Sequence, residues 1–248
     1  IYTLSLHDAL PISTSIVAFS ALIHASFQLS VSVLTLLSGH SLGKQTARRK
    51  VLRLMNGFVC GVLVLTALLI SAIVYYLSLV IHHAAQAEQL VAAIVCGLMV
   101  GLGVATWAVY YRRGGGTALW LPRSFATYLS KRSKTTRHSA EAFSLGMASV
   151  VAELLFIIGP MAAAGLATVL LPSTEWRLIA IALYVVISLL SLVVVLVLVG
   201  SGHSLARLQQ WRMAHKRFLQ FTAGGSLIIL GGFLFVDRVL GIVSYGGF

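Results

Sequence analysis

Six long apolar stretches fill this chain, and the segments that join them alternate between strongly basic and almost free of lysine and arginine. A bilayer has a hydrocarbon core about 30 Å thick, which an α-helix of roughly 20 apolar residues can cross. Every stretch reaches that length. The sequence therefore predicts an all-α, polytopic membrane protein with six transmembrane helices, at about 14–38, 54–81, 90–111, 142–171, 178–200 and 218–243.

Composition and charge agree with a membrane protein. The chain is 58% hydrophobic and 10% charged, with a mean hydropathy of +0.95, which is far from the balance of a soluble domain. Its net charge of +12 would favour nucleic acid in a soluble protein, but all except Arg177 and Arg238 of its 18 basic residues follow the first, third and fifth helices. By the positive-inside rule these three loops are cytoplasmic and both termini lie outside. We therefore expect no nucleic-acid partner.

The first residues of the chain stand apart from the rest. Residues 2–12 read YTLSLHDALPI, which resembles one reading frame of a sequencing adapter, and Ile1 is not an initiator methionine. We expect residues 1–13 to be a non-native N-terminal scar and residues 14–248 to form a single transmembrane domain.

Polar residues in the first and fourth predicted helices are the candidate functional groups. His24, Gln28 and Ser32 are spaced four residues apart, which places them on one face of a helix. The fourth helix carries Glu153 near the middle of the membrane, with Ser149 one turn earlier. Ionisable groups at this depth face the bundle interior, a partner or a water-filled cavity, and are functional candidates by default. We expect the two helices to face each other around a shared cavity.

Glu153 has two interpretations. In the functional one, Glu153 and His24 relay a proton or contact a cation, because an imidazole changes its charge near neutral pH. Pro160 then supplies a break in the fourth helix, and broken helices at the midplane are where transporters bind their cargo. In the structural one, Glu153 is a neutral or paired group that only holds the fourth helix to the first.

Two short repeats point to different internal relationships. The tripeptide Ala-Phe-Ser occurs at 18–20 and again at 142–144, which fits two inverted three-helix halves. The string SGHSL occurs at 38–42 and at 201–205, after the first and fifth helices. Local helix capping explains its glycine and histidine. The alternative is a paired cytoplasmic gate formed by His40 and His203.

Two further patterns concern lipid and helix packing. Aromatic and basic residues alternate in the loop segment 117–134, which predicts a short amphipathic helix on anionic lipid of the inner leaflet; a solvated basic linker is the alternative. Glycines four residues apart predict close helix contacts in two places, at Gly57 with Gly61 and at Gly97 with Gly101.

These features together resemble the lysine-exporter superfamily of small transporters. The resemblance is carried by the six helices, the outside termini, the His24-Ala25 dipeptide in a polar first helix and the polar motif of the fourth. It implies export across a bacterial cytoplasmic membrane. Metal exporters of this group place an acidic residue and a second histidine shortly after the first His-Ala. Here residues 26–29 read Ser-Phe-Gln-Leu, so we assign no metal ligands.

The sequence thus predicts a small-solute or cation transporter that works by alternating access. Glu153 would carry the coupling proton or contact a cation, and His24 and Gln28 would line the cavity. The alternative is a non-transporting membrane scaffold or biogenesis factor at the inner leaflet. We expect no enzymatic activity, and we assign no catalytic residue and no cofactor.

Overall fold

The computed structural model describes residues 6–27, 29–38, 45–83, 87–109, 128–129, 131–133, 135–201, 210–211 and 214–240. Within these ranges all regular structure is helical and there is no β-strand. The predicted all-α fold is therefore confirmed for the described residues. Gln28, His40 and His203 lie outside them, as does most of the loop segment 117–134.

The first apolar stretch is divided in two. Helix α1 (Leu6–Ser26) and helix α2 (Leu29–Ser38) are separate, so the single helix predicted at 14–38 is wrong. At the end of α1, the Phe27 N–H donates to the His24 carbonyl at 3.1 Å, and Ser26 Oγ donates to the Ile23 carbonyl at 2.6 Å. Such local bonds compete with continuation of the helix. Helix α1 also includes residues 6–13 of the predicted scar as its first turns.

Three long helices follow and match the second to fourth predictions in position. They are α3 (Gln45–His83), α4 (Ala87–Val109) and α6 (Ser139–Val169). Helix α6 continues through Pro160, so the break predicted there is wrong. Membrane helices tolerate proline where neighbouring groups compensate for the missing N–H.

The fifth apolar stretch is bent instead. Helices α7 (Thr174–Ser188) and α8 (Leu190–Gly200) meet at 47° around Leu189. Ser188 Oγ donates to the Val185 carbonyl at 2.9 Å just before the bend, and serine bonds of this kind often bend helices. The last stretch forms α10 (Lys216–Leu234), which continues into a short π-helical segment, η1 (Phe235–Leu240).

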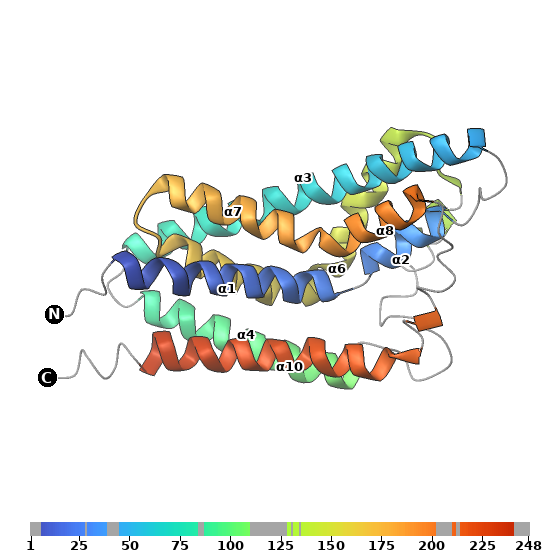
Figure 1. Cartoon of the computed structure of the whole chain (residues 1–248). Coiled ribbons are helices and arrows are strands. Elements are labelled where there is room, and N and C mark those ends of the chain that lie inside the picture. The colour runs from blue at the N-terminus through green and yellow to red at the C-terminus, as the bar shows by residue number, and fades with distance from the viewer. Residues whose placement is uncertain are drawn as a thin grey trace, which may run out of the picture.

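The helices form one elongated bundle (Figure 1). Helices α4 and α10 lie side by side along one edge, and α1 packs between α10 and α7 (Figure 1). Helix α1 packs on both α6 and α7, while α2 packs on α8. The two divided stretches therefore run next to each other. The first turn of α1 and the end of η1 lie at the same end of the bundle (Figure 1).

The described helices define a polytopic integral membrane protein. Four of them are long and apolar enough to cross a bilayer, or five if α7 and α8 count as one bent crossing. The prediction of six full spans is not met, because the apolar part of α1 is short and ends at Ser26. Large apolar side chains remain exposed on the helices, as lipid contact requires; examples are Leu68, Leu90, Val186 and Ile229.

Glycine packing follows the prediction in one place and not in the other. Gly57 and Gly61 of α3 lie against the backbone of α6 at Ser139 and Phe143, where a Cβ atom would collide. The predicted close contact is confirmed there. A Cβ atom on Gly97 or Gly101 would meet nothing within 4 Å in the described part of the chain, so that second prediction is wrong.

Candidate functional site

A small, partly polar pocket lies where the two divided stretches meet. Helix α1 contributes its last turn, α7 and α8 contribute their bend, and α3 and α6 close the remaining sides. The lining residues are His24, Phe27, Val62, Thr66, Glu153, Ser188, Leu189, Ser191 and Leu192. Helix discontinuities of this kind at membrane depth are tolerated where they line a cavity or are buried in protein.

His24 joins the two divided stretches directly. Its ring Nδ1 and Tyr184 Oη of α7 share a hydrogen bond of 3.0 Å, and both side chains are buried. Tyr184 lies one turn before Ser188, on the face of α7 that leads to the bend. The bond therefore fixes the orientation of the imidazole beside the pocket and ties α1 to α7.

Glu153 brings the carboxylate to the same pocket from α6. The side chain is only 4% exposed, and Phe156, three residues later, stacks on Phe27 with ring centroids 5.8 Å apart. This aromatic contact holds the end of α1 against α6. His24 and Glu153, which the sequence singled out on separate helices, thus line one pocket.

Thr66 is a lining residue that the sequence analysis missed. It is fully buried in the middle of α3, and its Oγ1 has no hydrogen-bond partner among the described residues. Ser20, one turn before His24 on α1, also has a buried hydroxyl with no hydrogen-bond partner among the described residues. A buried hydroxyl without a partner costs about 1–3 kcal/mol, so such groups are uncommon.

The pocket is nearly closed in this conformation. Its volume is about 10 Å³, which is enough for one water-sized species. A larger solute requires the surrounding helices to move apart.

Ser149, Ser32 and Pro160 are not among the lining residues, and Gln28 lies outside the described residues. Ser149 is buried in α6 and donates to the Gly146 carbonyl at 2.7 Å. Ser32 lies in α2, where its carbonyl accepts a bond from Thr35 Oγ1. Pro160 is buried further along α6. The proposed gate residues His40 and His203 are not described, but the helices that precede them, α2 and α8, pack on each other.

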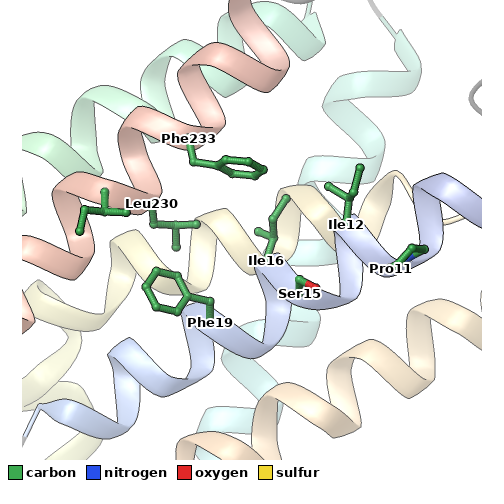
Figure 2. A pocket seen from close by; sticks show the side chains of 8 residues that line it. Pro11, Ile12, Ser15, Ile16, Phe19, Leu230 and Phe233 are labelled. Atoms are coloured by element: carbon green, nitrogen blue, oxygen red, sulfur yellow. The ribbon is translucent and has the colours of Figure 1, made fainter.

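A larger cavity lies between α1 and α10, and it is apolar. Figure 2 shows Ile16 and Phe19 of α1 facing Leu230 and Phe233 of α10 across it, and its volume is about 420 Å³. Ser15 is the only polar residue among the described residues that line it. Pro11 and Ile12 complete the lining, and they belong to the segment that we expect to be non-native. The cavity therefore offers no basis for assigning a ligand.

The described residues contain no group of three or more His, Cys, Asp or Glu side chains that could hold a metal ion. No protein-family model, curated protein or solved structure matches the chain. The functional argument therefore depends on the pocket alone.

Proposed function

We propose that the protein is a membrane transporter for a small solute or cation, and that it works by alternating access around the pocket at the two helix discontinuities. One observation carries the proposal: the buried side chains of Glu153 and His24 line the same small cavity.

Three features support this function. Ionisable groups inside a membrane are costly and normally mark ion or substrate pathways. Transporters place their sites at interrupted helices near the midplane, and α1 with α2 and α7 with α8 are interrupted beside this pocket. The near closure of the pocket fits an occluded state, from which one group of helices rocks against the other.

Each lining group has a defined role in the proposed cycle. Glu153 carries the coupling proton or contacts the transported cation, because it is the only acidic residue among the described lining residues. His24, held by Tyr184, presents the imidazole to the same space. Export as the direction follows from the resemblance to lysine exporters. A second role for the pocket, as a purely structural contact in a membrane scaffold, predicts no flux.

Transport currents test the proposal. Purified protein is reconstituted in liposomes, adsorbed to a solid-supported membrane, and exposed in turn to each common amino acid and to monovalent and divalent cations. We expect current with at least one of them and a loss of about tenfold or more in Glu153→Gln, which keeps the side-chain shape but removes the charge.

Glu141→Gln is the matched control. Glu141 lies at the start of the same helix and its carboxylate accepts the Arg137 N–H at 3.0 Å, away from the pocket. This variant should keep the wild-type current. Well-folded protein that gives no current with any probe, or an undiminished current in Glu153→Gln, would contradict the proposed function.

A further inference from the structure

The hydroxyl of Thr66 behaves differently from the hydroxyls of comparable threonines in this protein. Thr106, Thr168 and Thr222 each donate to the carbonyl four residues earlier, at 2.7, 2.7 and 3.0 Å. This bond satisfies a threonine inside an apolar helix without any other partner. Thr66 makes no such bond to Val62, although it is fully buried, and both residues line the pocket. Its oxygen is therefore available to a ligand in the pocket.

The charge of the pocket favours a monovalent cation over a divalent one. Glu153 supplies one carboxylate, and no second acidic residue is among the described lining groups. Helices α1 and α7 both end at the pocket, and helix C-termini carry partial negative charge. Calcium takes roughly six to eight oxygen ligands and magnesium keeps several of its waters, and a pocket of about 10 Å³ has no room for such a shell. A transition metal would require a cluster of nitrogen or sulfur ligands, and the described residues contain no such cluster.

The size of the pocket and the oxygen atoms of its lining residues further limit which ion it can bind. A volume of about 10 Å³ admits a single bare ion or one water, and excludes an organic solute. The oxygen donors are the hydroxyls of Thr66, Ser188 and Ser191 together with the Glu153 carboxylate. Ser188 Oγ already donates to the Val185 carbonyl, so its lone pairs can face a cation. Hard oxygen ligands beside interrupted helices are the setting in which transporters coordinate sodium.

We propose that this pocket is a Na⁺ site, with Thr66 Oγ1 and the Glu153 carboxylate as ligands, and that Na⁺ is the coupling ion of the transport function proposed above. The assignment of coupling rests on that function, whereas the binding of Na⁺ can be measured without it. It gives the Thr66 hydroxyl, which has no hydrogen-bond partner among the described residues, a ligand.

Binding of ²²Na⁺ and thermal unfolding of the purified full chain in detergent test the site. At a fixed ionic strength, NaCl at ten times its dissociation constant should raise the Tm by about 3 °C relative to choline chloride, and KCl should not. Thr66→Val should weaken ²²Na⁺ binding at least tenfold. Without Na⁺ this variant should be at least as stable as the wild type, since it removes an unpartnered hydroxyl.

Two further variants keep the test decisive. Thr66→Ser retains the hydroxyl and should bind ²²Na⁺ within about threefold of wild type. Thr106→Val removes a hydroxyl that already has a partner, in α4 and away from the pocket, and should leave ²²Na⁺ binding unchanged. An equal effect of NaCl and choline chloride, or loss of binding in Thr66→Ser as well as Thr66→Val, would overturn the Na⁺ site.

The outcomes separate the two proposals. Transport currents that depend on Glu153, in a protein that shows no Na⁺ binding, would overturn the Na⁺ site and leave the transport function standing. Specific Na⁺ binding that is lost in Thr66→Val, in a protein that carries no current with any probe, would support the site and remove the transport function.

Discussion

The α4–α10 pair and the α1–α3–α6–α7 group use their polar side chains in different ways. In the pair, Gln220 Nε2 of α10 donates to the carbonyls of Thr106 and Trp107, both at 2.8 Å, in the last turn of α4. The Trp107 indole N–H donates to the Phe221 carbonyl, and the two rings stack with centroids 5.3 Å apart. Each of these polar side chains makes hydrogen bonds between α4 and α10.

In the α1–α3–α6–α7 group, His24, Thr66 and Glu153 line the pocket instead. His24 and Tyr184 bond to each other, but the hydroxyls of Ser20 and Thr66 are buried without a partner among the described residues. Polar groups that join two membrane helices satisfy each other, and a buried hydroxyl without a partner costs stability. If the proposed function is right, the unpartnered hydroxyl of Thr66 is kept at that cost because it binds a ligand.

The largest predicted effect tests whether the pocket has rigid walls. A methyl group on Gly61 would collide with the Phe143 carbonyl, so Gly61→Ala must push α3 away from α6. We expect the free energy of unfolding to fall by about 3 kcal/mol, the upper range for overpacking. Reversible unfolding in mixed detergent micelles measures it.

Gly97→Ala is the control, because a Cβ atom there meets nothing within 4 Å in the described part of the chain. Alanine is the better helix former, so this variant should be unchanged or stabilised by up to about 1 kcal/mol. Equal destabilisation by both variants would show that helix α3 is not held against α6 by backbone contact.

The sequence predicted the apolar part of each long helix but not the interruptions. The spans of α4 and α6 follow from hydropathy, whereas α3 begins at Gln45, nine residues before its predicted start. The bonds from Ser26 to the Ile23 carbonyl and from Ser188 to the Val185 carbonyl accompany the two interruptions, but a bond of the same kind, from Ser149 to the Gly146 carbonyl, lies inside the continuous α6. Neither hydropathy nor a serine residue by itself therefore locates an interruption. Proline, the more familiar signal, marked Pro160, where the helix continues.

The two short sequence repeats can be compared with the positions of the helix interruptions. The SGHSL string follows the two stretches that are divided and lie side by side, and α2 and α8, which precede it, have 10 and 11 residues. The Ala-Phe-Ser tripeptide would relate the first stretch to α6, which has no matching break. The described helices therefore give no support to two inverted halves.

The site was predictable where a residue is unusual in an apolar helix. A histidine and a carboxylate stand out in a membrane span, so the sequence singled out His24 and Glu153, and both line the pocket. A single threonine does not stand out, because its hydroxyl normally bonds to its own helix, as that of Thr106 does. Whether Thr66 makes that bond depends on a side-chain rotamer, which the sequence does not specify.

A smaller effect is predicted for the bond that ties α1 to α7. Tyr184→Phe removes the hydroxyl that bonds His24 and leaves a buried ring nitrogen without that partner. The free energy of unfolding should fall by about 1.5 kcal/mol, and transport current should fall with it because the imidazole loses its fixed orientation. Tyr75→Phe, at a residue that is 59% exposed, is the control and should change neither quantity. A fully active Tyr184→Phe would show that the orientation of His24 does not matter to transport.

The smallest effect is predicted for a variant at the α4–α10 contact. This variant should change stability but not transport. Gln220→Met keeps the length of the side chain but removes both donors to the end of α4. Interhelical hydrogen bonds in membranes contribute about 0.6 kcal/mol on average, so the free energy of unfolding should fall by roughly that amount.

Transport current and ²²Na⁺ binding should stay at wild-type levels in Gln220→Met, since neither Gln220 nor its partners line the pocket. Gln210→Met, at an exposed glutamine outside this contact, controls for the change of side chain. A selective loss of transport in Gln220→Met would mean that the α4–α10 pair moves in the transport cycle. The separation between adhesive and functional polar groups would then fail, because a contact between two helices outside the pocket would also be part of the mechanism.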